Sequence, residues 1–177
     1  MMKKILIPFL FFALIFQVGA QETKKAEVKW LSFEEAIKLN EKNPKPLLID
    51  VYTDWCGYCK KMDRTTYKNE VIVQYINKNF HPVKLNGEEK EDITFKDYTF
   101  KFKNQGRRGY NEFAAALLNG KLSYPTTVIM NKELQLLDRV PGYLDAKIME
   151  KVVTFFATEK YKTETWQDFV KGFKSNL

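Results

Sequence analysis

The sequence is poor in the side chains that build metal and haem sites. It contains two cysteines and one histidine among 177 residues. A structural zinc site takes about four ligands, and His81 is the sole histidine beside the two cysteines. Attachment of a c-type haem needs a histidine directly after the second cysteine, where this chain has Lys60. Neither kind of site is expected, and no metal or organic cofactor is predicted.

Blocks of one charge sign are also missing. The 29 Lys and Arg residues and the 22 Asp and Glu residues give a formal net charge of +7, and the two signs are interspersed. Long blocks of like charge are typical of nucleic-acid-binding arms, so no nucleic-acid partner is expected. The chain also lacks internal repeats and low-complexity linkers, which predicts that residues 21–177 form a single domain, expected to be a monomer.

The one long apolar run lies at the N-terminus and is short for a membrane span. Lys3 and Lys4 precede it, residues 5–16 form it, and the small residues of 18–20 follow it. This order is typical of a secretory signal peptide and predicts that residues 1–20 are removed after about Ala20. The protein is then expected outside the cytosol, in a bacterial periplasm, where disulfides persist. A retained N-terminal anchor is the alternative.

The residues that carry chemistry follow a second, shorter apolar run. Residues 47–52 predict a buried strand, Cys56 and Cys59 come just after it, and a helical pattern follows. The N-terminus of a helix stabilises a thiolate and so lowers the pKa of the first cysteine. The second cysteine, one turn on, can attack a mixed disulfide and release the product. The stretch therefore predicts thiol–disulfide chemistry. A structural disulfide is disfavoured, because so short a loop removes little entropy from the unfolded chain.

With its neighbours, this motif resembles the thioredoxin superfamily over roughly residues 28–157. The matching positions are Trp55 before Cys56, Asp50 six residues before Cys56, Lys84 on the next predicted strand, the Tyr124-Pro125-Thr126 loop and Gly142. The resemblance implies an α/β fold with a central mixed β-sheet flanked by helices. It also implies that protein thiols and disulfides are the substrates, and that an upstream redox donor or acceptor, expected in the membrane, resets the cysteine pair.

The resemblance also implies roles for single residues. Cys56 is the expected nucleophile, and Cys59, the more buried, is the expected resolving thiol. A cis Pro125 is expected to face them and to leave backbone groups free to pair with an extended substrate chain. The residues expected to contact the substrate are Trp55, Gly57, Tyr58, Tyr124 and Pro125. Lys84 and Gly142 are expected to support the site.

Asp50 lies inside the predicted strand, where a charged carboxylate is costly, so we expect its pKa to be raised. The resemblance implies that Asp50 accepts a proton, through water, when Cys59 attacks. The alternative is a purely structural carboxylate paired with Lys84. His81, just before Pro82, is interpreted as structural or exposed rather than catalytic.

An insertion at about 87–110 precedes the proline loop. The elements predicted in and after it are a hairpin of 93–95 with 98–102, a turn at 104–109 and a helix at 111–118. Two interpretations stay open. The insertion shapes a binding surface beside the cysteines, or its aromatic side chains cover the edge of the sheet.

The other elements follow from periodicity and capping signals. The predicted strands are an edge strand at 28–30 and strands at 126–131 and 134–140. The predicted helices are at 32–42, from Cys59 to about 67, at 70–79 and from Asp145. A C-terminal helical extension is predicted at about 160–177 and includes a helix from Thr165. The apolar faces of these helices are predicted to include Leu39 and Ile148. The last helix is expected to dock on the domain rather than on a membrane.

The direction of the reaction does not follow from the motif, because it depends on the reduction potential. Gly57-Tyr58, between the cysteines, resembles the pair in bacterial disulfide isomerases. An obvious dimerisation domain is missing, however, so reduction of protein disulfides is the favoured hypothesis. The alternatives are a disulfide isomerase or oxidase, a chaperone-like binding module that uses the groove around Tyr58, Tyr124 and Pro125, and a peroxidase-like use of Cys56.

Overall fold

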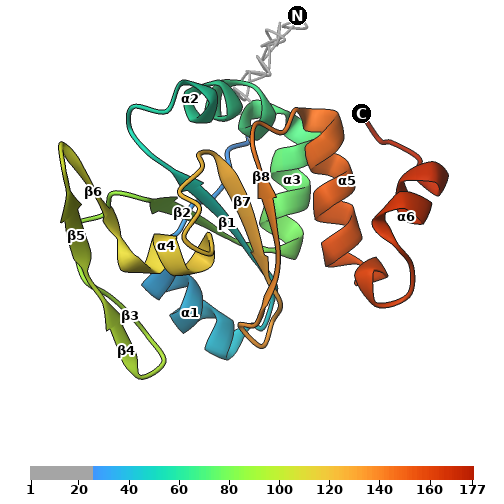
Figure 1. The fold of residues 1–177 in the computed structure, drawn as a ribbon. Helices are drawn as coiled ribbons and strands as arrows, with labels where there is room; N and C mark the ends of the chain where they lie inside the picture. The colour runs from blue at the N-terminus through green and yellow to red at the C-terminus, as the bar shows by residue number, and fades with distance from the viewer. Residues whose placement is uncertain (1–25) are drawn as a thin grey trace, which may run out of the picture.

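A four-stranded sheet forms the centre of the computed structural model, which describes residues 26–177 (Figure 1). Its strand order is β2 (His81–Asn86), β1 (Leu47–Tyr52), β7 (Thr126–Met130) and β8 (Leu136–Pro141). β1 is parallel to β2 and antiparallel to β7, and β7 is antiparallel to β8. The predicted mixed sheet is therefore confirmed. The predicted signal peptide lies outside the described residues.

Helices cover both faces of this sheet (Figure 1). The helices of the described residues are α1 (Phe33–Lys42), α2 (Gly57–Arg64), α3 (Glu70–Asn79), α4 (Glu112–Leu117), α5 (Ala146–Ala157) and α6 (Trp166–Gly172), with short 3-10 segments η1 (Thr66–Lys68) and η2 (Lys160–Lys162). Of these, α6 packs on α5 and not on the sheet. Side chains of a strand point alternately to the two faces. Leu47, Ile49 and Val51 of β1 accordingly pack with α1 and α4, whereas Leu48 packs with α3 and α5. By the same alternation Asp50 points to the face covered by α3 and α5.

Capping side chains explain where several helices begin. Ser32 and Glu35 form the predicted capping box of α1. The side chain of Asn69 accepts backbone N–H groups at the start of α3, and that of Asp145 does the same at α5. The bounds of α3 match the predicted helix at 70–79.

Two predicted boundaries are wrong. The helix after the cysteines ends at Arg64, and η1 replaces its predicted continuation. The hydroxyl of the buried Thr66 donates to the carbonyl of Leu144 at 2.6 Å, which favours the break over a continued helix. The edge strand predicted at 28–30 is reduced to a single bridge between Leu31 and Val83, because the N–H of Lys29 donates to the side chain of Asn77 instead.

Two helix faces also differ from the prediction. Leu39 and Ile148, expected to face inward, are 41% and 42% exposed. In α1 the buried neighbour Asn40 takes the inward position. Its side chain donates to the carbonyl of Lys132 and accepts the N–H of Lys45. A polar residue with satisfied hydrogen bonds therefore occupies a site that the apolar pattern assigned to leucine.

The insertion forms two β-hairpins beside the sheet (Figure 1). They pair β3 (Ile93–Phe95) with β4 (Tyr98–Phe100) and β5 (Phe102–Gln105) with β6 (Arg108–Asn111). The first hairpin was predicted, but its second strand ends at Phe100 rather than at Phe102, which begins β5. The turn predicted at 104–109 is wrong, because Asn104 and Gln105 pair with Gly109 and Arg108 and leave the turn to the two residues between them.

The C-terminal helix docks on α5, as predicted (Figure 1). The rings of Trp166 and Phe169 lie 5.3 Å and 5.1 Å from the ring of Phe155. Beyond α6, the buried carboxylate of Glu150 accepts the N–H of Asn176 at 2.6 Å, which ties the end of the chain to α5. No helix within residues 26–177 is long and apolar enough to cross a membrane.

Candidate functional site

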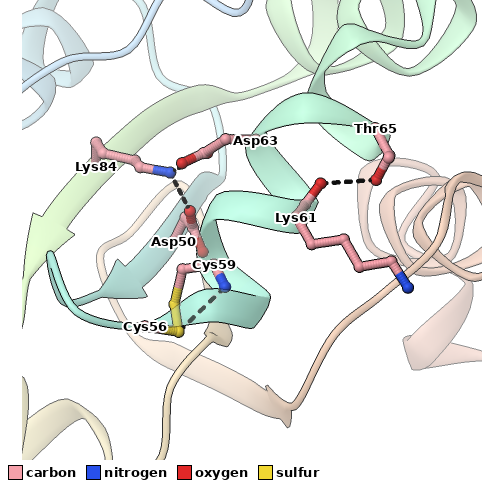
Figure 2. Close-up of polar contacts among 7 residues, drawn as sticks. All are labelled: Asp50, Cys56, Cys59, Lys61, Asp63, Thr65 and Lys84. Atoms are coloured by element: carbon pink, nitrogen blue, oxygen red, sulfur yellow. Dashed lines mark hydrogen bonds and ion pairs between the residues drawn. A yellow bond between two sulfur atoms is a disulfide. The ribbon is translucent and has the colours of Figure 1, made fainter.

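The two cysteines lie where the chain leaves β1 and begins α2 (Figure 2). Cys56 is the N-cap residue of α2, and its Sγ accepts the N–H of Cys59 at 3.1 Å. The two sulfur atoms form a disulfide with an S–S distance of 2.05 Å. Cys56 is 5% exposed and Cys59 1%. In the reduced protein the same N–H group and the helix dipole favour a thiolate on Cys56.

A lysine connects the buried carboxylate of β1 to the helix of the cysteines (Figure 2). Lys84 of β2 lies opposite Asp50 in the parallel register, and its Nζ is 2.6 Å from Asp50 Oδ2. The same ammonium group pairs with Asp63 of α2. The side chain of Asp50 is 1% exposed, whereas that of Asp63 is 41% exposed. Lys84 thus links a buried carboxylate to one that water reaches.

Sequence reasoning places Lys84 beside Asp50 but misses Asp63. Asp63 follows Cys59 by four residues in a predicted helix, a spacing that puts both side chains on one face. A carboxylate at this spacing from Cys59 was the sequence signal that could have identified Asp63 as part of the site.

Three aromatic rings surround the ammonium group of Lys84. Its Nζ lies 5.0 Å from the ring centroid of Trp30, 4.9 Å from that of Tyr52 and 5.4 Å from that of Tyr67. Burial by itself lowers the pKa of Lys84, but the carboxylates of Asp50 and Asp63 outweigh burial, and the net shift is upward. Lys84 therefore stays charged at neutral pH.

Asp50 has one oxygen held and one without a partner. Burial raises the pKa of Asp50, and the charge and hydrogen bond of Lys84 offset part of that rise. Oδ2 contacts Lys84, whereas Oδ1 is buried and has no hydrogen-bond partner among residues 26–177. This arrangement leaves Oδ1 able to take up a proton.

The proline loop has the predicted backbone. The peptide bond between Tyr124 and Pro125 is cis, and the N–H of Gly142 donates to the carbonyl of Pro125 at 2.8 Å. Gly142 has a φ of +94°, a conformation that favours glycine. The ring of Tyr124 lies edge-on to Trp55 with 5.9 Å between centroids, which places this loop beside the residue before Cys56. Burial raises the pKa of Tyr124 to about 12, so its phenol is neutral.

An exposed surface adjoins the buried cysteines. Trp55 is 49% exposed and Tyr58 is 64% exposed. A Cβ atom placed on Gly57 between them would meet no atom within 4 Å. Trp55 and Tyr58 are therefore accessible to a large partner at the position where the substrate was expected, whereas Tyr124 is half-buried and Pro125 is buried.

Two charged residues that sequence reasoning does not identify hold Trp55. Oε1 of Glu88, just after β2, accepts the indole N–H at 2.9 Å. The guanidinium carbon of Arg108, in β6, lies 4.1 Å from the centroid of the Trp55 ring. No pattern in the sequence links residues so far apart, although Arg108 lies in the insertion for which a binding role was considered.

The single histidine has a structural contact. His81 is buried, and its Nε2 lies 2.7 Å from the carbonyl oxygen of Asn43. This contact joins β2 to the loop that follows α1. Within residues 26–177, no group of three or more His, Cys, Asp or Glu side chains is placed to hold a metal ion.

The family of the chain follows from a comparison with protein-family models. The model for a thioredoxin-like domain matches residues 33–157. The chain belongs to this thioredoxin-like family. The match runs from the start of α1 to the end of α5, so α6 lies beyond it. A cysteine pair at disulfide distance in this fold supports thiol–disulfide oxidoreductase activity.

Solved structures and curated proteins include several relatives of this thioredoxin-like protein. A candidate disulphide-isomerase from Bacteroides thetaiotaomicron is 25% identical with a TM-score of 0.55, over 80% of this chain and 99% of that one. A thioredoxin-fold protein from Helicobacter pylori is 19% identical with a TM-score of 0.55, over 73% and 80% of the two chains, which shows the fold alone. The thiol:disulfide interchange protein DsbD of Yersinia enterocolitica is 30% identical over 57 residues, which are 28% of this chain and 10% of that protein. The chain spans 11% and 42% of the length of the first two curated relatives it matches.

Proposed function

We propose that this thioredoxin-like protein reduces disulfides of other proteins, with Cys56 as the nucleophile and Cys59 as the resolving thiol. The observation that carries the proposal is the position of Cys56 at the N-cap of α2, where its sulfur accepts the N–H of Cys59. Hydrogen bonding and the helix dipole make Cys56 the thiol that ionises at neutral pH.

The reaction proceeds by two thiol–disulfide exchanges. The Cys56 thiolate attacks one sulfur of the substrate disulfide, forms a mixed disulfide and displaces the other substrate sulfur as a thiolate. Asp50 then takes the proton of the Cys59 thiol through water, and the resulting thiolate attacks Sγ of Cys56 and releases the second substrate sulfur as a thiolate. Two electrons pass from the dithiol to the substrate, and Cys56 and Cys59 are left as a disulfide. No metal or organic cofactor takes part.

The substrate is proposed to lie across the exposed surface beside the cysteines. Trp55, Gly57 and Tyr58 line it on one side, and Tyr124 and Pro125 on the other. An extended chain presents backbone groups that pair with those beside the cis proline. Lys84 and Gly142 act indirectly, Lys84 through Asp50 and Gly142 by holding the carbonyl of Pro125.

The cellular setting belongs to the same proposal. The charged, apolar and small-residue segments of residues 1–20 support export to a bacterial periplasm. The exported protein is proposed to act as a monomer. A donor in the membrane then returns the disulfide to the dithiol after each turnover. The similarity to the thiol:disulfide interchange protein DsbD supports exchange with other dithiol proteins.

Disulfide isomerisation is the second candidate. It is favoured by the similarity to the Bacteroides thetaiotaomicron structure described as a candidate disulphide-isomerase, which is covered almost completely. An isomerase uses the same first attack by Cys56, but the substrate's own thiol then resolves the mixed disulfide.

Trapping of the mixed disulfide tests the proposal. The Cys59→Ser variant lacks the resolving thiol, so it is expected to accumulate complexes with substrate proteins that a reductant dissolves. Non-reducing gel electrophoresis of the variant incubated with disulfide-bonded proteins measures this accumulation. The matched Cys56→Ser variant, which keeps the more buried thiol, is expected to trap little. Equal trapping by both variants contradicts the assignment of Cys56 as nucleophile. Trapping by neither variant contradicts it too and favours a binding module.

The equilibrium reduction potential of the Cys56–Cys59 pair tests the direction. A value near about −270 mV against glutathione is expected for a reductase. A value near about −120 mV, with a strongly acidic Cys56, contradicts reduction and favours an oxidant or isomerase.

A further inference from the structure

Trp55 is exposed, yet three separate segments contact its indole ring. Glu88, just after β2, accepts its N–H at 2.9 Å, and Tyr124 of the proline loop lies edge-on at 5.9 Å. Arg108 of the inserted β5–β6 hairpin lies over the ring at 4.1 Å. An exposed tryptophan without such contacts samples several rotamers, so these contacts restrict the side chain next to Cys56.

The hairpin that carries Arg108 is itself fixed to the sheet. The N–H of Asn111, at the end of β6, donates to the carbonyl of Gly87 at 2.8 Å. The side-chain amide of the same fully buried Asn111 donates to the carbonyls of Glu89 and Glu91, each at 3.1 Å. Arg108 therefore lies on a strand held against the loop that carries Glu88, and both residues reach Trp55 from one anchored unit.

We propose that Arg108 is a positioning residue, which holds Trp55 in the orientation that receives a protein substrate. A planar guanidinium stacks on an indole face and stays charged at every physiological pH. A side chain that is already ordered loses less entropy when a partner binds to it. The inference rests on the proposed function, because Trp55 is taken there as a substrate contact.

Substrate size is the property that should reveal this role. A cavity of about 730 Å³ lies beside the hairpin, and its lining includes Arg107, Arg108, Asp54 and Glu88. Trp55 directly precedes Cys56 and is exposed, so a protein substrate bound at Cys56 is expected to contact the Trp55 ring. A small aromatic disulfide needs only the sulfur of Cys56, so its reduction is expected to be independent of Arg108.

The test compares Arg108→Ala with Arg108→Lys and Arg107→Ala. Arg107→Ala is the matched control, since it removes the same charge from the wall of the same cavity. Arg108→Ala is expected to raise KM for a protein disulfide about two- to fivefold, the strength of an exposed cation–π contact, with kcat unchanged. Arg108→Lys keeps the charge but not the planar group, so an intermediate KM is expected. KM for dithiobis(nitrobenzoate) and the reduction potential should not change.

A second readout reports on the ring itself. The ¹⁵N order parameter of the Trp55 indole N–H is expected to fall in Arg108→Ala and not in Arg107→Ala. The indoles of Trp30 and Trp166 are internal references in the same spectra. If Arg108→Ala matches Arg107→Ala in both KM and order parameter, the inference is wrong. If no protein disulfide is reduced even by the unmodified chain, the proposed function fails, and a selective fall of the Trp55 order parameter still supports positioning by Arg108.

Discussion

Replacing Asp50 with asparagine is expected to slow release of the substrate from the mixed disulfide about a hundredfold at neutral pH. The amide cannot accept the proton of Cys59, and Oδ1 of Asp50 is the buried oxygen without a partner among the described residues. Single-turnover release from a preformed mixed disulfide on Cys56 measures this step alone. In the unmodified protein the rate should rise with pH through the raised pKa of Asp50 and then level off.

The variant should respond to pH differently. Without Asp50 the rate is expected to keep rising until the Cys59 thiol ionises by itself, which for an ordinary cysteine occurs near about pH 8.5. Asp63→Asn is the matched control, because it also removes a carboxylate from Lys84 but leaves Asp50 in place. A rate and a pH profile unchanged in Asp50→Asn would show that the carboxylate serves structure alone, which is the alternative that the sequence left open.

The same substitution has a stability effect of predictable sign. The pKa of Asp50 is raised by burial in the folded protein, so the folded state holds this proton to higher pH than the unfolded state does. Between the ordinary carboxyl pKa of about 3.9 and the raised value, stability therefore falls as pH rises. Asp50→Asn should remove this fall and be the more stable protein at neutral pH. Lys84 retains Asp63 in the variant. Urea unfolding of the unmodified protein and of Asp50→Asn, both oxidised, measures the free energy of unfolding across this pH range.

The elements that sequence reasoning predicts well are those with strong local signals. The buried strand before the cysteines, the capping box at Ser32 and the helix at 70–79 are each specified by residues within one segment. The pairing of Asp50 with Lys84 was also predictable. Both residues lie on adjacent predicted strands, and the family resemblance supplied the register.

Contacts between segments distant in the sequence were not predictable in this way. Arg108 lies 53 residues after Trp55, and only the β5–β6 hairpin and its anchor at Asn111 bring the two together. The turn predicted at 104–109 concealed that hairpin, because its residues favour turns as single positions but pair as strands. Leu39 shows a similar limit, since the buried Asn40 depends on hydrogen bonds to residues outside its helix.

The first hairpin of the insertion packs against the core, where Phe100 of β4 contacts Phe113 of α4. Phe113 of α4 is 2% exposed, and its ring lies 4.3 Å from that of Phe33 and 5.1 Å from that of Phe100 in β4. Phe113→Ala is therefore expected to lower the free energy of unfolding by about 3–5 kcal/mol in urea titrations. Tyr98→Ala, in the hairpin strand that also carries Phe100, is the control, since Tyr98 is 55% exposed and its loss should cost about 1 kcal/mol or less.

A double-mutant cycle tests whether the β3–β4 hairpin is part of the hydrophobic core or only lies on the protein surface. Phe100→Ala and Phe113→Ala are expected to be coupled by at least about 0.5 kcal/mol, because the two rings are in contact. Additive effects, or a loss for Phe113→Ala no larger than for Tyr98→Ala, would mean that the hairpin merely lies on the surface. Coupling would instead mean that both interpretations of the insertion hold, one for each hairpin: aromatic packing for the first hairpin and a binding surface for the second. The β3–β4 hairpin would then pack on α4 through Phe100, whereas the β5–β6 hairpin reaches Trp55 through Arg108.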